Sequence, residues 1–343
     1  MEKNLEKAFH WYQKDNDYII AMNNLAAYYY NREETGKNLA KAFQWYQKAT
    51  ENGNVMTMNN LAICYENGEG KEKDLEKVFY WYQKAAENDN GMTMNSLAIC
   101  YKNGEGTEKS LEKVFQWYQK AAENDYIMVM NNLGICYENG EGTEKNLAKA
   151  FQWYQKAAEN GNEMTMNYLA ICYENGEGTE KDLEKAFHWY QKAAEKDYIK
   201  AMYKLANFYK NGEGTEKDLE KAFQWYQKAA ENGNEMAMNN LAICYENGEG
   251  TEKNLEKAFQ WYQKAAENGN VIAMDNLASC YYNGEGVEKN FEKAIHWYQK
   301  AAENGNEVAM NNLAICYYYN EEEMEKNLEN ALYWYKKAAE NGR

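Results

Sequence analysis

Two patterns of apolar residues alternate along the chain, and each has the period of an α-helix. In the best-preserved copy the first pattern covers residues 236–247, and at 100° per residue its apolar side chains share one face. They are Ala237, Met238, Leu241, Ala242, Cys244 and Tyr245. The second pattern covers residues 255–268, with a stripe of Leu255, Ala258, Phe259, Trp261, Tyr262, Ala265 and Ala266. Both patterns predict amphipathic helices, which we call helix A and helix B.

The two helices form a unit that recurs from one end of the chain to the other. Successive tryptophans are 34, then seven times 36, then 37 residues apart: Trp11, Trp45, Trp81, Trp117, Trp153, Trp189, Trp225, Trp261, Trp297 and Trp334. A period of this length indicates a repeat architecture, in which each unit buries its apolar face against its neighbours. The predicted fold is an all-α solenoid of nine antiparallel A–B pairs. We expect a single solenoid over residues 1–343, with an unpaired helix B in residues 1–15 and nine repeats in residues 16–343.

A pair of glycines lies between helix A and helix B in seven copies, as at Gly248 and Gly250. No strand precedes this loop and no Gly-Lys-Ser/Thr follows, so a phosphate-binding loop is not indicated. The alternating ligands of a calcium loop are also missing. We expect the glycines to supply positive φ angles in a tight turn. Asn254 is a predicted N-cap of helix B, and Gly269 a predicted left-handed residue after it.

The charge of the chain restricts its partners, because the formal net charge is −16. This field repels nucleic acids and anionic lipid surfaces, so neither is an expected partner, and it favours basic ones. No stretch approaches the ~18 apolar residues that a membrane span requires. Residues 1–14 are charged and amphipathic and lack the apolar segment of a signal peptide. We therefore expect a cytoplasmic location.

All seven cysteines occupy one position of the repeat: Cys64, Cys100, Cys136, Cys172, Cys244, Cys280 and Cys316. Equivalent points of successive repeats should lie about 10 Å apart, which is too far for a disulfide. Tyr28 and Phe208 fill the same position in the other two copies, which is typical of a packing position. Three histidines in scattered copies cannot complete zinc sites. We predict small buried hydrophobes, with no metal and no cofactor.

The repeat has the signature A-x-x-x-L-[AG]-x-x-Y-x-x-G-x-G-x-x-x-[DN]-x-x-K-A-x-x-W-Y-x-K-A-A-x-x-G. It resembles the Sel-one-like repeats, which are relatives of the tetratricopeptide repeats, and the resemblance covers the whole chain. The resemblance implies a right-handed solenoid of antiparallel helix pairs. It also implies an adaptor that assembles other proteins, in signalling or in protein degradation at the endoplasmic reticulum. The chain lacks the proline of the family's loop, and it has one cysteine per repeat where disulfide-stapled relatives have two.

No constellation of residues suited to catalysis is present, so an enzyme is not expected. His10, His188 and His296 stand directly before tryptophan, in a position that the other copies fill with glutamine or, in two of them, tyrosine. This exchange is typical of a solvated surface position, and no matching Ser or Cys and Asp complete a catalytic set. The leading interpretation is a scaffold for protein or peptide partners. The alternative is a regulatory or targeting region of a longer multidomain enzyme, such as a kinase.

The predicted binding surface is the face of helix A opposite its core, which lines the concave side of the solenoid in the related families. Asparagine recurs there, at Asn23, Asn59, Asn95, Asn131, Asn167, Asn239 and Asn311, with Tyr203 and Asp275 in two copies. Asparagine offers both a donor and an acceptor, so such a ladder could hold an extended peptide backbone. Isoleucines on the same side, such as Ile243, could add apolar contacts. Simple solvation, or copying by duplication, would leave the same pattern.

One copy departs from the others in residues 196–210, where it becomes basic and aromatic. The residues that set this region apart are Tyr203, Lys204, Asn207 and Lys210, with Tyr168 on the preceding helix A. We predict a selective anchor for an acidic peptide, in which Lys204 or Lys210 makes charge-assisted hydrogen bonds. Neutral drift of a single copy is the alternative.

The first and last units keep core residues although no repeat covers them. At the N-terminal end these are Leu5, Phe9, Trp11 and Tyr12, and at the C-terminal end Leu332, Trp334 and Tyr335. We therefore expect apolar end surfaces. Either the chain continues in its native context or the ends self-associate.

Overall fold

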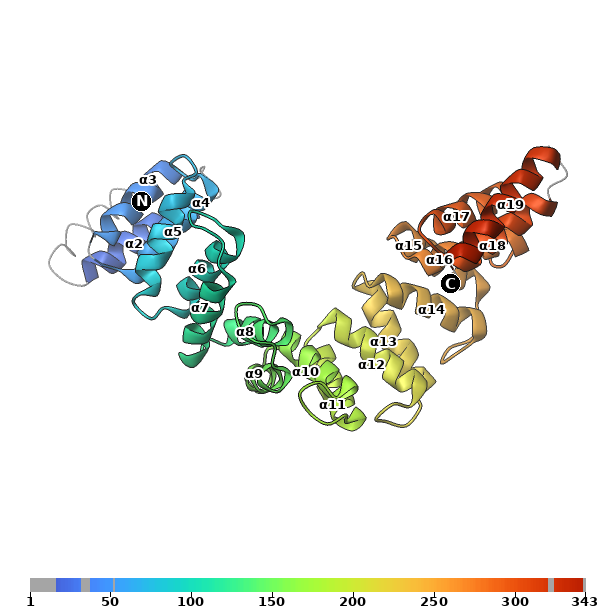
Figure 1. Cartoon of the computed structure of the whole chain (residues 1–343), viewed down its shortest axis with the longest axis horizontal. Helices are drawn as coiled ribbons and strands as arrows, with labels where there is room; N and C mark the ends of the chain where they lie inside the picture. The colour runs from blue at the N-terminus through green and yellow to red at the C-terminus, as the bar shows by residue number, and fades with distance from the viewer. Residues whose placement is uncertain (1–16, 32–37, 52, 320–323, 342–343) are drawn as a thin grey trace. The chain divides into compact units, whose positions relative to one another are not determined.

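The computed structural model describes residues 17–31, 38–51, 53–319 and 324–341, and all regular structure in these residues is helical (Figure 1). The A helices are α2 (Asp17–Tyr30), α4 (Val55–Asn67), α6 (Gly91–Asn103), α8 (Ile127–Asn139), α10 (Glu163–Asn175), α12 (Ile199–Asn211), α14 (Glu235–Asn247), α16 (Val271–Asn283) and α18 (Glu307–Tyr319). The B helices are α3 (Leu39–Thr50), α5 (Leu75–Ala86), α7 (Leu111–Glu123), α9 (Leu147–Glu159), α11 (Leu183–Glu195), α13 (Leu219–Glu231), α15 (Leu255–Glu267), α17 (Phe291–Glu303) and α19 (Met324–Asn341). The predicted all-α fold of nine A–B pairs is confirmed. The predicted unpaired helix B lies outside the described residues.

Side-chain caps fix where the helices begin. Asn254 accepts a hydrogen bond from the backbone N–H of Lys257 at 2.9 Å, as predicted for the start of helix B. The structure also shows a cap that was not predicted. Asn234 accepts a hydrogen bond from the backbone N–H of Ala237 at 2.7 Å and starts helix A. Tyr126 and Tyr198 stand in this second position in α8 and α12, and there no side chain caps the helix.

The glycine pair between the helices has two different functions. Gly140 has φ +75° and ends α8, and Gly142 has φ +73°, so both occupy the predicted left-handed region. A Cβ on Gly142 would lie 2.0 Å from the carbonyl oxygen of Leu111, at the start of the preceding helix B. The second glycine therefore lets the turn pack directly on the preceding repeat. Aspartate takes the left-handed position after helix B in three copies, as predicted: Asp89 (φ 59°), Asp125 (φ 59°) and Asp197 (φ 63°).

The core consists of small and branched residues between the helices. Leu241 and Ala242 of helix A and Ala258 and Tyr262 of helix B are buried. All seven cysteines are buried and none forms a disulfide, which confirms that their position is a packing position. The tryptophans of the B helices are only half-buried, and in most of them a lysine ammonium group lies over the ring, as at Lys264 and Trp261 (4.6 Å to the centroid).

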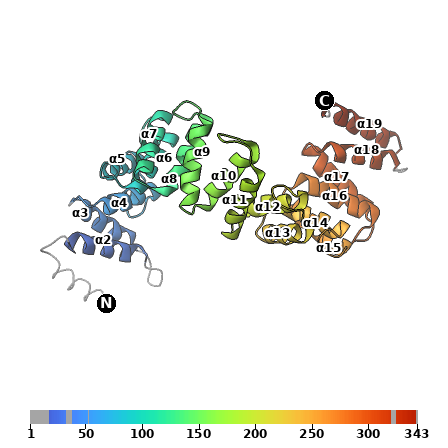
Figure 2. The same cartoon turned by 90° about the horizontal axis from the view of Figure 1, so that it is seen from below.

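The helices group into two compact units, which are described separately. Unit 1 comprises residues 1–165 and 177–179, and unit 2 comprises residues 166–176 and 180–343. Within each unit an A helix packs on the helix B of its own copy and on the helix B before it, as α8 does with α9 and α7. The pairs of unit 1 follow one another from α2 to α9 (Figure 2). The prediction of one solenoid over the whole chain stays a prediction.

Candidate functional site

The face of the A helices opposite their core, which we call the outward face, carries an exposed apolar residue at one position of nearly every copy. These residues, which we call the apolar stripe, are Ile20, Met56, Met92, Met128, Met164, Met236, Ile272 and Val308. Their exposed fractions lie between 42% at Met164 and 62% at Met56. In α12 the position holds the exposed Lys200. Recurring exposure of large apolar side chains is typical of an interaction surface.

The apolar stripe was not among the predicted binding residues, although the sequence contains a signal for it. Each member stands five residues before the core leucine of its helix, as Met128 does before Leu133. Five residues correspond to 500°, which places the side chain about 140° from the leucine and away from the core. The neighbouring isoleucines, which were predicted to face the same side, are half-buried or exposed, with Ile99 at 39%.

Members of the predicted asparagine ladder accept hydrogen bonds from the following A helix, where the donor is the asparagine directly after the next ladder position; we include these donors in the ladder. The amide Nδ2 of Asn60 donates to Oδ1 of Asn23 at 3.2 Å, and Asn132 donates to Asn95 at 3.3 Å. In unit 2, Asn276 donates to Asn239 at 3.0 Å and Asn312 to Asp275 at 3.1 Å. Four members are at most 8% exposed: Asn59, Asn131, Asn167 and Asn239. The ladder therefore ties neighbouring repeats together, and part of its capacity for hydrogen bonds is used within the chain.

Two ladder members lack a hydrogen bond at their buried carbonyl oxygen. Oδ1 of Asn131 and Oδ1 of Asn167 have no partner among the described residues. Elsewhere the donor amide stands 37 residues further along, and at these two places that position holds Tyr168 and Lys204. Both hydrogen bonds are missing because tyrosine or lysine replaces the donor asparagine in these two copies.

Contacts between asparagine and methionine place the ladder beside the apolar stripe. Nδ2 of Asn23 lies 3.9 Å from the sulfur of Met56, and Nδ2 of Asn131 lies 3.7 Å from the sulfur of Met164. The thioether is a weak acceptor, so these contacts orient the methionine without holding it rigidly. The surface thus combines adaptable apolar side chains with a row of amides.

Glutamates on the same face are held by tyrosines of helix B. The hydroxyl of Tyr82 donates to Glu66 at 3.0 Å and that of Tyr262 to Glu246 at 2.6 Å. Tyr154 with Glu138 and Tyr190 with Glu174 make the same bond. Burial, followed by this bond, raises the pKa of Tyr190 and of Tyr262 above the ordinary value. These tyrosines therefore stay protonated and fix half-buried carboxylates beside the ladder.

Both lysines of the predicted anchor are already paired with carboxylates of this chain. Nζ of Lys204 lies 3.0 Å from Oε1 of Glu174, and Nζ of Lys210 lies 3.2 Å from Oε2 of Glu249. The second pair has a counterpart in unit 1, where Lys102 lies 3.6 Å from Glu141. A partner's carboxylate would therefore have to displace a carboxylate of this chain, and its capture by these lysines stays a prediction.

The other predicted anchor residues are only partly accessible. Asn207 accepts a hydrogen bond from the hydroxyl of Tyr226. Tyr203 is half-buried, with its ring centroid 6.1 Å from that of Tyr226. Tyr168 is half-buried on α10. The region is thus a packed cluster of aromatic and charged side chains that are each only partly exposed to solvent.

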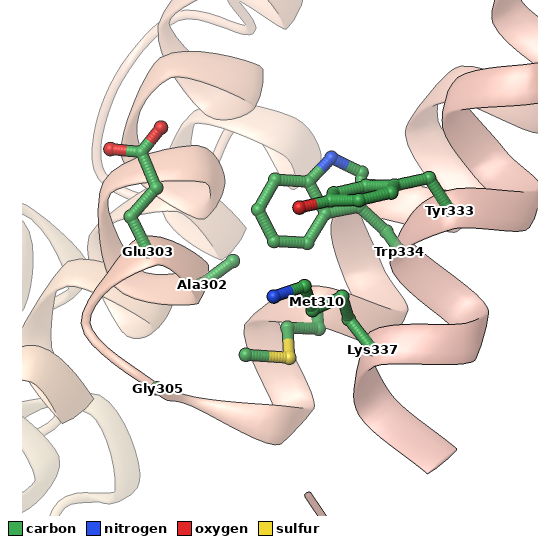
Figure 3. A pocket seen from close by; sticks show the side chains of 7 residues that line it. All are labelled: Ala302, Glu303, Gly305, Met310, Tyr333, Trp334 and Lys337. Atoms are coloured by element: carbon green, nitrogen blue, oxygen red, sulfur yellow. The ribbon is translucent and has the colours of Figure 1, made fainter. Parts of the chain in front are cut away.

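A cavity of about 300 Å³ lies at the C-terminal end, between α17, α18 and α19. It is lined by Ala302, Glu303, Gly305, Met310, Tyr333, Trp334 and Lys337 (Figure 3). Leu332 and Tyr333 beside it are 55% and 52% exposed, so this end surface is apolar, as expected. The N-terminal residues that were predicted to form the other end surface lie outside the described residues.

The described residues show no cluster of three or more potential metal ligands. His188 and His296 are exposed on helix B beside a tryptophan, as predicted, and His10 lies outside the described part. Among the helices α2 to α19, none has the length and apolar character to cross a membrane.

Comparison with known proteins identifies the repeat. The family model of the Sel1 repeat matches ten segments: residues 1–14, 19–54, 55–90, 92–126, 127–162, 164–198, 199–234, 235–270, 271–306 and 308–342. The crystal structure of c5321, a protective antigen of uropathogenic Escherichia coli strains with an SLR fold, is 32% identical. That match covers 99% of this chain and 72% of that one, with a TM-score of 0.87. A Sel1 repeat protein from Oxalobacter formigenes is 28% identical over 90% of this chain and 88% of its own, with a TM-score of 0.73. No curated protein matches the sequence.

Proposed function

The chain belongs to the Sel1 repeat family, and from this premise we propose that it is a non-catalytic scaffold for protein or peptide partners. The partners bind along the outward face of the A helices, where the apolar stripe and the asparagine ladder lie side by side. The single observation that supports this proposal most directly is the exposure of the stripe in eight of the nine A helices: α2, α4, α6, α8, α10, α14, α16 and α18.

A row of solvated methionines is unfavourable for an isolated soluble chain. Each of these side chains is about half exposed and so forgoes roughly 1 kcal/mol of burial free energy, and a row of them increases the risk of aggregation. A partner that covers the row recovers this free energy. Methionine also suits such a surface, because its unbranched side chain adapts to different shapes.

The further details of the proposal rest on the sequence and on the family. They are a role in signalling or in protein quality control, a cytoplasmic location, and no binding to nucleic acid because the net charge is −16. A regulatory region of a longer enzyme is the alternative. It would use the same surface for binding, and a catalytic domain encoded next to the repeats would identify it.

Site-specific photo-crosslinking in the native host tests the proposal. A photoreactive amino acid replaces Met128 on the apolar stripe or, as a matched control, Gln116 on the exposed face of helix α7. We expect Met128 to form crosslinks to a small set of proteins that Gln116 does not form. Identical crosslinked products at the two positions would contradict the proposal.

A further inference from the structure

We propose that the apolar stripe of unit 1 binds an extended, basic segment of a partner protein that presents an apolar side chain at every third residue. This inference rests on the proposed function and specifies its partner. It follows from the spacing of the stripe, the amide of Asn60 beside it and the charge of the A helices.

The stripe of unit 1 is unbroken over five consecutive copies, at Ile20, Met56, Met92, Met128 and Met164. Unit 2 has a shorter run of three copies, at Met236, Ile272 and Val308, which follows Lys200 of α12. A ligand that contacts equivalent positions in five copies must itself have a regular spacing of apolar groups. The spacing of the stripe in unit 1 therefore determines how many ligand residues lie between one apolar side chain and the next, which we call the register of the ligand.

The distance between copies selects that register. Hydrogen bonds from Asn60 to Asn23 and from Asn132 to Asn95 keep successive A helices close, at an axial spacing of about 10 Å. An extended chain in the polyproline II conformation advances about 3.1 Å per residue and has three residues per turn, so three residues span one copy and every third side chain faces the stripe. An α-helix advances about 1.5 Å per residue and would need seven.

The amide of Asn60 favours the extended ligand over a helix. Asn132 makes hydrogen bonds with both Asn95 and Tyr118. Asn60 is half-buried and uses one of its two N–H groups on Asn23. The remaining N–H can bind a main-chain carbonyl of a ligand. An extended segment has carbonyl groups to offer along its length, whereas an α-helix has already bonded most of its own.

The charge of unit 1 favours a basic ligand. Helices α4 and α8 contain Glu66 and Glu138 and no lysine or arginine. In α6 the single lysine, Lys102, is paired with Glu141 at 3.6 Å. Together with the net charge of −16, this arrangement attracts cationic side chains placed between the apolar ones.

Fluorescence anisotropy with the full chain and designed peptides tests the inference. The first peptide, of about 15 residues, has leucine at every third position with lysine and serine between. The second has the same composition with the leucines grouped together, and in the third glutamate replaces lysine. We expect the first peptide to bind at least about tenfold more tightly than either of the others, and its affinity to fall as salt is added.

Protein variants show whether the peptide occupies the stripe. The pair Met92→Lys and Met128→Lys should weaken binding of the first peptide by about tenfold or more. Gln116→Lys adds the same charge on helix B and should leave binding unchanged, and Met128→Leu should preserve it. Lysine is accommodated at this position in α12, at Lys200, and circular dichroism checks that each variant is folded.

Three results would overturn the inference: equal binding of the first two peptides, no binding of the first, or full binding to the double lysine variant. Each leaves the proposed function to be judged by the crosslinks from Met128. If those crosslinks are specific while the peptides fail, the surface binds partners of a different register. If they are not specific, the scaffold proposal itself falls.

Discussion

Methionine occupies two positions of helix A, and these place the side chain in opposite surroundings. At the first, the side chain belongs to the exposed apolar stripe, as at Met56, Met92 and Met128. At the second, two residues further along, it is at most 5% exposed in most copies, as at Met94, Met130 and Met238. The same residue type thus serves as a contact surface at one position and as core filling at the other.

This contrast predicts the order in which the methionines oxidise. Dilute hydrogen peroxide should convert Met56, Met92 and Met128 to sulfoxides first, because oxidation follows access to the sulfur. Met94 and Met130 should react only when the chain unfolds. Peptide mapping by mass spectrometry over a time course measures both rates. Similar rates at Met128 and Met130, which lie on the same helix, would contradict the structure.

The cysteines supply a prediction about reactivity and pH. Burial raises the pKa of Cys64, Cys100 and Cys280 to about 12 and that of Cys136, Cys244 and Cys316 to about 11, from an ordinary value of 9.0. The native thiols stay protonated and covered at about pH 8, so a thiol reagent should modify them only after unfolding. Rapid modification of the folded chain would contradict this.

The same shifts determine how stability changes in alkali. Between about pH 9 and pH 12 the unfolded chain loses thiol protons that the folded chain keeps, so the free energy of unfolding falls as the pH rises. Below about pH 9 both states hold these protons and the thiols add no pH dependence. Urea unfolding at about pH 8 and about pH 10.5 should therefore show a lower midpoint at the higher pH.

At the scale of the element, the backbone conformation of the turn between the helices could be predicted from the sequence, but its packing on the preceding repeat could not. The left-handed φ angles of Gly140 and Gly142 could be predicted, because a glycine pair between two helical patterns requires them. The approach of Gly142 to Leu111 could not, because it depends on how one repeat stacks on the next. Helix boundaries were predicted to within about one residue, since the caps and glycines are local signals.

The two glycines should differ when they are changed to alanine. Gly140→Ala has mainly the cost of a left-handed alanine, about 1–2 kcal/mol, because its nearest neighbour, the backbone nitrogen of Lys145 at 3.3 Å, needs to shift only slightly. Gly142→Ala has the same cost and also places a Cβ 2.0 Å from the carbonyl oxygen of Leu111. We expect Gly142→Ala to lower the free energy of unfolding clearly more than Gly140→Ala in urea titrations. Equal losses would mean that the turn does not press on the preceding helix.

At the scale of the whole molecule, the sequence predicted the solenoid of helix pairs more fully than the binding surface. The asparagine ladder was predicted on the outward face, but its bonds, such as Asn60 to Asn23, join different copies and depend on the distance between them. The pairing of Lys204 with Glu174 has the same origin. The apolar stripe could have been predicted, because it follows from the helical period of a single copy. The period gives no sign of the division into two units within α10, since the pattern continues unchanged there.

This division leads to a prediction about cooperativity. Leu169 in α10 is fully buried, and α10 contributes residues to both units. Leu169→Ala should lower the free energy of unfolding by about 2–5 kcal/mol, because it leaves a cavity in the core. In a repeat array, coupling passes only between neighbouring units, so a weak central repeat should separate the unfolding of the two sides. We expect urea unfolding, followed by far-UV circular dichroism, to change from one transition to two of similar amplitude.

Leu313→Ala in α18 is the matched control, since it removes the same atoms from an equally buried position near the C-terminal end. In a chain of residues 1–343 its loss should affect mainly the repeats next to α18, because coupling in a repeat array passes only between neighbours. A small early transition followed by a large one is therefore expected for this variant. If both variants instead show one transition with a lowered midpoint, all the repeats unfold together, and the division within α10 has no energetic counterpart.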